Sequence, residues 1–319
     1  MNSPEPKIVY MGSAEFAVPA LGALAKAGCD VTAVVTQPDR ARGRGGRLSP
    51  TPVGLYAEIM GLPMLKPERL KDNEEFMLAL RDAAPDLIVV AAYGKLLPTS
   101  VLELPAFGCV NIHASLLPEY RGAAPVQRAI LDGKKETGVT LIHMNEGLDA
   151  GDIIAAARVD ISDMTAGLLT GVLAVRGAEL LRDTLPMLMN GTAPRIPQDG
   201  SKATYAEKVV KAEGRLDFTQ TADSIVLRVR AMAPAPGAYV MNDGERIGVT
   251  AARALGGSGG IVMDHDAAAP GTVVSVSKQG IAVRAGDGIV LIEALKAPGR
   301  KSMSVEEYLK GNVFDAKSL

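Results

Sequence analysis

The sequence has few cysteines and no tryptophan. Its two cysteines, Cys29 and Cys109, form no Cys-x-x-Cys pair, and each lies in or beside an apolar run. We interpret both as buried thiols in a reducing environment. The segment MNSPEPKIVYMG lacks the basic start and long apolar stretch of a signal peptide, and no apolar stretch is long enough to span a bilayer. These absences predict a cytoplasmic protein with no membrane partner.

A strong excess of one charge is also missing. The formal net charge is -2, and hydrophobic residues make up 47% of the chain, which argues against a protein that coats nucleic acid nonspecifically. One basic, glycine-rich cluster nevertheless stands out, and its arginines are Arg40, Arg42, Arg44 and Arg47. A length of 319 residues favours two domains.

Several cofactor motifs are absent. The turn after the first apolar run, GSAEFA, has the single glycine Gly12, and neither GxGxxG nor GxxxxGK[ST] occurs. The three histidines show no metal-ligand spacing, and no GxSxG segment is present. We therefore expect neither a dinucleotide nor a metal.

The first half of the chain alternates between two patterns. Short apolar runs typical of strands cover residues 7–11, 31–36, 87–92, 109–113 and 139–144. Helical patterns cover residues 16–27, 53–60 and 73–84, and a long helix is expected over 165–190, capped by Thr165 and ended by Gly191. The alternation predicts an α/β domain with a Rossmann-like, mainly parallel sheet, whose ligands bind at the carboxyl ends of the strands.

The second half changes character. Residues 190–208 are polar, punctuated by proline and glycine, and without periodicity, which is typical of a linker. Beyond them, strand patterns predominate, at residues 238–241, 247–251, 271–276, 280–283 and 288–295. We expect a catalytic domain over residues 1–189, a linker over 190–208 and a smaller β-barrel domain over 209–319.

Asn111 and His113 are the first candidates for a site. They lie two positions apart on a strand, so their side chains share a face, and they lie near its carboxyl end. From spacing alone, two interpretations remain equally open: a functional pair, or two side chains that hydrogen-bond loop backbone.

Asp149 is the third candidate. It lies in GLDAGDI, after the next strand, where a neighbouring loop would bring it close to His113. An asparagine amide can stabilise an oxyanion, a histidine can share that role or move a proton, and an aspartate can orient the imidazole and hold a water. Because no serine or cysteine nucleophile accompanies them, the trio favours direct acyl transfer to an amine.

These segments resemble a known family. NIHASLLPEYRGAAPVQRAI with GLDAGD resembles the signature of the 10-formyltetrahydrofolate-dependent formyltransferases. The resemblance spans nearly the whole chain: TQPDRARGRGGRLSPTPV resembles the basic loop of the methionyl-tRNA formyltransferases within that family. PQDGSKATYAEK, RVRAMAPAPGAY and PGRKSMSVEEYLKG resemble their linker and OB-like second domain. The chain departs from the family at Ser13-Ala14, where Thr-Pro is usual, and at Ala235, where tryptophan is usual.

The resemblance implies residue roles. Asn111, His113 and Asp149 would be catalytic. The residues expected to bind folate are Ser115, Leu116, Leu117, Pro118, Tyr93, Gly94, Gly147 and Leu148. Those expected to bind tRNA are Arg40, Arg42, Arg44, Arg47, Lys208 and Lys211, with Arg228, Arg230, Arg300 and Lys301 also facing phosphate.

The resemblance also implies the partners. The formyl donor would be 10-formyltetrahydrofolate, and the acceptor the α-amine of the initiator methionyl-tRNA, in support of translation initiation. We expect a monomer that uses no metal. Two alternatives remain: formyl transfer to a small amine, such as a purine precursor or an amino sugar, and a noncatalytic RNA-binding relative.

Overall fold

The structure is a computed structural model that describes residues 6–42, 46–255, 268–314 and 317–319. The chain folds into two compact units. The first unit holds the described residues up to Pro125, together with Glu136–Asp160 and Thr170–Ala206. The second unit holds Val126–Lys135, Ile161–Leu169 and the described residues from Glu207 onward. Two short pieces that precede Glu207 in the chain therefore belong to the second unit.

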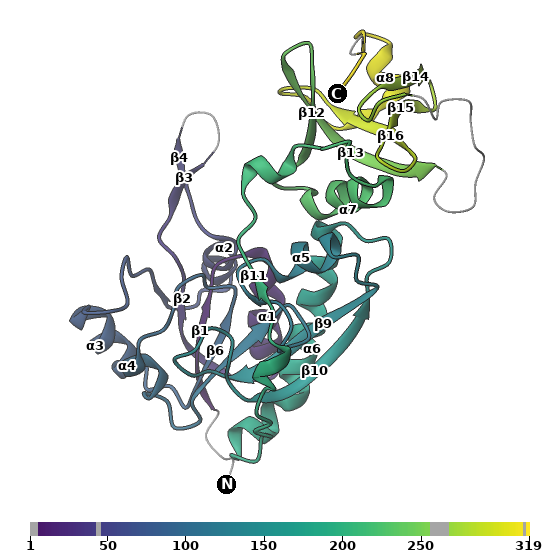
Figure 1. Ribbon diagram of the computed structural model, residues 1–319. Coiled ribbons are helices and arrows are strands. Elements are labelled where there is room, and N and C mark those ends of the chain that lie inside the picture. The colour runs from purple at the N-terminus through teal and green to yellow at the C-terminus, as the bar shows by residue number, and fades with distance from the viewer. Residues whose placement is uncertain (1–5, 43–45, 256–267, 315–316) are drawn as a thin grey trace. The chain divides into compact units, whose positions relative to one another are not determined.

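The first unit is built on a seven-stranded sheet with the order β10-β9-β7-β6-β1-β2-β5 (Figure 1). The strands are β1 (Lys7–Gly12), β2 (Asp30–Val35), β5 (Met64–Leu65), β6 (Leu87–Ala91), β7 (Cys109–His113), β9 (Glu136–His143) and β10 (Ile153–Asp160). The five from β5 to β7 in this order are parallel, and at one edge β9 is antiparallel to β7 and β10 is antiparallel to β9. The expected Rossmann-like, mainly parallel sheet is confirmed.

Helices cover this sheet. They are η1 (Glu15–Ala17), α1 (Val18–Lys26), α2 (Pro52–Ile59), α3 (Glu74–Asp82), α4 (Thr99–Leu102), α6 (Ala166–Met189) and η2 (Gly200–Lys202). Asn73 caps the start of α3, because its side chain accepts a hydrogen bond from Phe76 N at 3.0 Å. The buried Phe76 and Leu80 lie on one face of this helix. On the opposite face of the sheet, Gly177 of α6 lies so close to Ile112 that an added Cβ would be 2.7 Å from its Cγ2.

Successive side chains of the parallel strands point to opposite faces of the sheet, and both faces are covered, so the side chains on both faces are apolar. Val9 and Met11 of β1 and Ile88 and Val90 of β6 belong to one cluster, which includes Phe76. The intervening residues of these strands are also buried. These strands are therefore continuous apolar runs, which is why their positions could be predicted.

Three short pairings lie outside the main sheets. Strands β3 (Arg40–Arg42) and β4 (Arg47–Ser49) form an antiparallel hairpin, which stands clear of the sheet in Figure 1. Strands β8 (Arg121–Gly122) and β11 (Tyr205–Ala206) pair in parallel. Ile196 also bridges to Ile153 of β10. Much of the polar segment after α6 is thus attached to the first unit.

The second unit contains an antiparallel sheet with the order β12-β13-β16-β15-β14, and β17 pairs with β16. Its strands are β12 (Ala238–Asn242), β13 (Glu245–Leu255), β14 (Val273–Ser277), β15 (Gly280–Arg284), β16 (Ile289–Lys296) and β17 (Met303–Ser304). Its helices are α5 (Pro125–Leu131), η3 (Lys211–Gly214), α7 (Ala222–Met232) and α8 (Val305–Leu309). The expected β-rich second domain is confirmed.

Among the described residues, no helix combines the length and the apolar character needed to cross a membrane.

Candidate active site

The candidate site lies where β7 ends, and β7 is the parallel strand that borders the antiparallel β9. Asn111 and His113 have the same strand parity, and the residue between them, Ile112, is buried. His113 is buried and Asn111 is half-buried. The sheet therefore delivers both polar side chains to its carboxyl edge, as sequence spacing predicted.

The loop between β9 and β10 supplies Asp149. Gly151 begins the return to the sheet, and a Cβ there would be 1.7 Å from the carbonyl oxygen of His143, so only glycine fits. Asp149 has φ 48°, a left-handed backbone conformation that aspartate tolerates better than most residues. The Asn145 side chain accepts a hydrogen bond from Gly147 N at 3.0 Å, which shapes the start of the loop.

The structure brings Asn111, His113 and Asp149 together. Asn111 Nδ2 donates to Asp149 Oδ1 at 3.3 Å, and His113 Nδ1 lies 3.5 Å from Asp149 Oδ2. The amide of Gly122 also donates to Asp149 Oδ2, at 2.8 Å. The carboxylate is thus held by donors from separate parts of the chain, and 14% of its side chain remains exposed.

Both ring nitrogens of His113 face oxygen acceptors. Nε2 lies 2.9 Å from the carbonyl oxygen of Tyr120, and Nδ1 faces Asp149. With both nitrogens facing protein oxygens, the ring is held in one orientation beside Asp149.

The segment expected to bind folate, Ser115 to Pro118, follows His113 directly. Ser115 is fully buried, and its hydroxyl donates to Glu119 O at 2.6 Å. Thr140 of β9 fixes the turn, because its hydroxyl donates to Ser115 O at 2.7 Å and accepts from Leu117 N at 3.1 Å. Leu116 and Pro118 are half-buried, and Leu117 is buried. The turn is rigidly placed beside His113.

Tyr93 and Gly94 lie in the loop after β6. The carbonyl oxygen of Tyr93 accepts hydrogen bonds from Gln37 Nε2 at 2.8 Å and from Ser13 Oγ at 3.5 Å. Ser13 also accepts from Gln37 N at 3.1 Å, so the serine that departs from the family pattern ties three segments together. Burial raises the pKa of Tyr93 to about 12, which keeps its phenol protonated.

Gly94, Gly147 and Leu148 are exposed. The structure therefore gives the expected folate residues two settings: buried positions in the turn beside His113 and at Tyr93, and exposed positions in the loops after β6 and β9.

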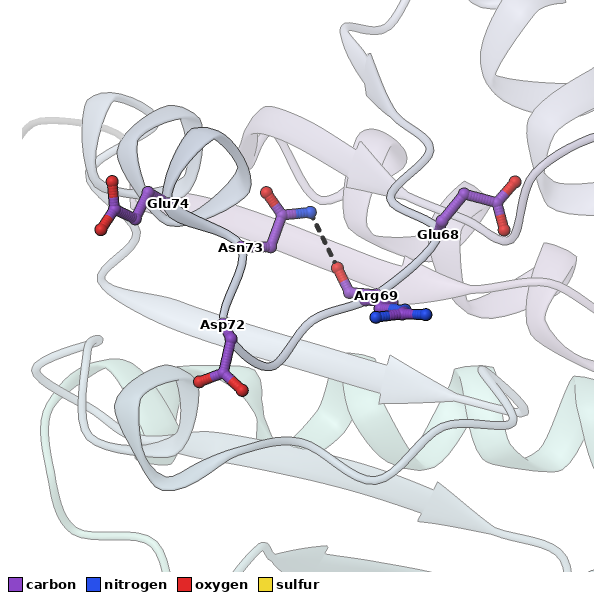
Figure 2. Close-up of a pocket in the computed structure, with 5 residues that line it drawn as sticks. All are labelled: Glu68, Arg69, Asp72, Asn73 and Glu74. Carbon is purple, nitrogen blue, oxygen red and sulfur yellow. Dashed lines mark hydrogen bonds between the residues drawn. The ribbon is translucent and has the colours of Figure 1, made fainter.

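A separate hollow lies just before α3, outside this site. It encloses about 590 Å³ and is lined by Glu68, Arg69, Asp72, Asn73 and Glu74 (Figure 2). Its three carboxylates point in different directions, and its one internal hydrogen bond runs from Asn73 Nδ2 to Arg69 O at 2.9 Å. Because its polar groups do not converge and acids outnumber cations, it is a poor site for anionic folate.

Comparison with known proteins identifies the family. Residues 6–181 match the profile described as formyl transferase, and residues 208–313 match the formyl transferase C-terminal domain. The chain belongs to the formyl transferase family. The methionyl-tRNA formyltransferase of Halorhodospira halophila is 47% identical over 306 residues, 96% of each chain. That of Moorella thermoacetica is 45% identical over 307 residues, again 96% of each. The expected family is confirmed, and the chain is a transferase.

Solved structures share the fold of this formyl transferase. The N-formyltransferase of Helicobacter canadensis, solved with folinic acid and dTDP-3-aminofucose, superposes with a TM-score of 0.65 at 18% identity. The match covers 90% of this chain and 98% of that one. At this identity the likeness shows the fold alone.

The basic residues expected to bind tRNA are placed unevenly. Arg40 is exposed, and its Nη2 donates to Gln37 Oε1 at 3.3 Å. Arg42 and Arg47 pair across the hairpin of β3 and β4, whereas Arg44 lies outside the described residues. Lys208 and Lys211 are exposed.

Two further arginines of this formyl transferase are tied to backbone. Arg228 Nη1 donates to Glu213 O at 2.8 Å. Arg230 donates to Met164 O at 3.1 Å and to Ile161 O at 2.8 Å, and burial lowers the pKa of its guanidinium. The hydrogen bonds of Arg230 join α7 to the segment before α6.

No group of three or more histidine, cysteine or acidic side chains is arranged to hold a metal ion in the part of the chain that the structure describes.

Sequence reasoning missed several groups that shape this site. Tyr120 contributes its carbonyl and Gly122 its amide, and main-chain groups leave no compositional signal. Arg121 and Gln198 are also close by, joined side chain to side chain. An arginine between the apolar residues of SLLPEY and GAAPV was the one available signal for that pair.

Proposed function

We propose that this formyl transferase moves the formyl group of 10-formyltetrahydrofolate to the α-amine of initiator methionyl-tRNA, in support of translation initiation. The convergence of Asn111, His113 and Asp149 at one strand end carries the proposal. Relatives 45% and 47% identical over nearly the full length, both named methionyl-tRNA formyltransferase, support the choice of acceptor.

The reaction needs a site for developing charge. The uncharged α-amine attacks the formyl carbon, a C–N bond forms, and the carbonyl electrons move to oxygen. Asn111 has a second amide N–H besides the one that Asp149 accepts, and it donates to this oxyanion. His113 adds electrostatic stabilisation from beside it.

Collapse of the tetrahedral intermediate completes the transfer. The oxyanion electrons return, the bond to N10 of the folate breaks, and N10 leaves with a proton while the amine loses one. Asp149 Oδ1 accepts from Asn111 and retains acceptor capacity for a water that carries this proton. No covalent enzyme intermediate forms.

The domains divide this work in the proposal. Residues 1–189 hold the donor and the reacting atoms, and residues 209–319 bind the tRNA. The arginines of the β3–β4 hairpin and Arg44, which lies between these two strands in the sequence, meet the acceptor end, and Lys208 and Lys211 meet phosphate.

The acceptor is tested directly. The protein is incubated with 10-formyltetrahydrofolate and either methionyl-tRNA or small amines, including a nucleotide-linked amino sugar. We expect formylated product with the tRNA alone. Equal turnover of a small amine would overturn the proposed acceptor and favour the alternative.

His113→Ala tests the catalytic assignment. We expect kcat to fall by at least about 100-fold with folate binding nearly unchanged, because the residue acts on the reacting atoms. The matched control is His143→Gln, a change at a buried histidine on the neighbouring strand β9. Activity that survives in His113→Ala would refute the role.

A further inference from the structure

Arg121 is a buried cation next to the catalytic site. Only 8% of the residue is exposed. Its Nε and Nη2 both donate to the side-chain oxygen of Gln198, at 3.1 and 2.7 Å. An arginine is costly to bury unless its donors are satisfied, so this pairing is a built feature of the fold.

Gln198 also reaches the Asp149 loop. Its Nε2 donates to Asp149 O at 2.8 Å and to Gly151 O at 2.7 Å. Both amide hydrogens and both lone pairs of the side chain are therefore used. The side chain is fixed in one orientation, with its donors on the loop and its acceptor on Arg121.

The contacts close a ring around Asp149. Its main-chain carbonyl is held by Gln198, and its carboxylate accepts from Gly122 N, the residue after Arg121. Asp149 must keep a left-handed backbone, at φ 48°, for its carboxylate to reach Asn111 and His113. A clamp on the carbonyls of both Asp149 and Gly151 holds the loop in that conformation.

We infer that Gln198 and Arg121 are a positioning pair that aims the Asp149 carboxylate at His113 and Asn111. The inference rests on the proposed function, because it deepens the role of the same site. Neither side chain touches the reacting atoms; they act through the backbone of residues 149–151.

Two substitutions test whether Gln198 positions the Asp149 loop or only attaches the segment after α6 to the first unit. Gln198→Leu removes every hydrogen bond. Gln198→Glu keeps an acceptor for Arg121 but loses both donors to the loop carbonyls. For both variants we expect kcat to fall on the order of 10-fold to 100-fold, since small misplacements of catalytic groups cost this much. KM for either substrate should change less than about threefold, on the same reasoning that binding contacts are untouched.

The matched control is Ser201→Ala, on the same segment, whose hydroxyl donates to Asp199. It should match the parent in kcat and in thermal midpoint. If Gln198→Glu keeps full activity, the pair is only a tether and the inference is overturned.

A double-mutant cycle with Asp149 adds a measurement, the single-turnover rate, whose coupling a purely structural role of Gln198 would not produce. In an Asp149→Ala background there is no carboxylate to aim, so Gln198→Leu should add little further loss in single-turnover rate. A full multiplicative loss would show that Gln198 acts independently of Asp149, against the inference.

The ring nitrogen chemical shifts of His113 test the clamp without substrate. They should differ between the parent and Gln198→Glu, because the facing carboxylate moves. Unchanged shifts would overturn the inference, whereas a parent protein that fails to formylate methionyl-tRNA would overturn the proposed function alone.

Discussion

Asn111 divides its amide between two tasks. One N–H donates to Asp149 Oδ1 at 3.3 Å, which fixes the side chain, and the other is left for the oxyanion. Because an asparagine amide has two donors on one planar group, orienting one of them orients the other. A single hydrogen bond thus prepares the donor before substrate arrives.

Asn111→Ala should remove the oxyanion donor. We expect kcat for formyl transfer to fall roughly 100-fold to 1,000-fold, the usual loss for one such donor, with KM for methionyl-tRNA little changed. Steady-state kinetics measure this, with Asn190→Ala at the exposed end of α6 as the control. A variant with raised KM and normal kcat would assign Asn111 to binding instead.

Cys109 should resist thiol reagents in the folded protein. Burial raises the pKa of its thiol to about 12, so the reactive thiolate is scarce under mildly alkaline conditions, and only 3% of the residue is exposed. We expect a Cys29→Ser variant to be labelled slowly when native and fully in urea, as measured by mass spectrometry. Fast native labelling would contradict the buried setting.

Residue chemistry was predictable where periodicity governs it. Asn111 and His113 share a strand face by parity. Asp149 follows β9, which is antiparallel to β7 and ends beside Val110, so strand order alone does not place its side chain. Gln198 is different, because it lies in an aperiodic segment and binds main-chain carbonyls whose positions depend on the finished fold. No local pattern carries that information.

Among the elements, the β3–β4 hairpin carries the basic cluster. Arg42 and Arg47 are paired positions across it. Hairpin geometry therefore brings together arginines that are separated in the chain, beside the exposed Arg40. In the proposed function, the arginines of this hairpin contact the nucleic-acid backbone.

Substituting Arg40, Arg42 and Arg47 together by alanine should weaken tRNA use. We expect KM for methionyl-tRNA to rise and the salt dependence of binding to flatten by roughly one counterion for each lost phosphate contact. Folate binding and kcat at saturating tRNA should stay near the parent values. An unchanged salt slope would mean that the hairpin does not face phosphate.

Two of the elements that the sequence patterns did not predict, β10 and α7, were missed for different reasons. In β10, alanines occupy exposed as well as half-buried positions, so the alternation in burial has no matching alternation in hydrophobicity. In α7, the buried Ile225, Val229 and Met232 recur at helical spacing, and Thr221 caps the helix by accepting from Ser224 N. The sequence therefore contains the spacing that predicts α7, but it contains no hydrophobic alternation that predicts β10.

At the scale of the molecule, an ion pair joins two distant stretches of the second unit. Arg128 of α5 donates from Nη1 and Nη2 to the two carboxylate oxygens of Glu213, at 2.6 and 3.2 Å. These hydrogen bonds lower the pKa of Glu213 in the folded protein below its ordinary 4.5. The pair is bidentate and three-quarters buried or more, the geometry in which such contacts matter.

The stability of the second unit should therefore depend on pH. Because the folded pKa of Glu213 is lowered, its contribution is fully present above the unfolded value and is lost as pH falls from about 4.5 through the folded value. Urea unfolding across the acid and neutral range measures this. Glu213→Gln should lower stability at neutral pH and flatten its decline in acid; an unchanged slope would remove Glu213 as a cause.

The same arrangement complicates truncation. Leu131 packs against the core of the second unit, although it precedes the last two strands of the main sheet in the chain. Deleting the residues beyond Lys208 would expose the apolar side chain of Leu131. Loss of activity in such a fragment would therefore not by itself show that the deleted residues bind the tRNA. Point substitutions in the hairpin and on the second unit are the cleaner test.

The parallel pairing of β11 with β8 bears on how members of this family can be recombined. Tyr205 and Ala206 are bound beside Arg121 and Gly122, and Gln198 precedes them. A chimera joined just after α6 would combine an Asp149 loop from one parent with a glutamine-bearing segment from the other. A junction placed after Ala206 inherits both from the same parent. Acceptor specificity should therefore be exchanged at that later point.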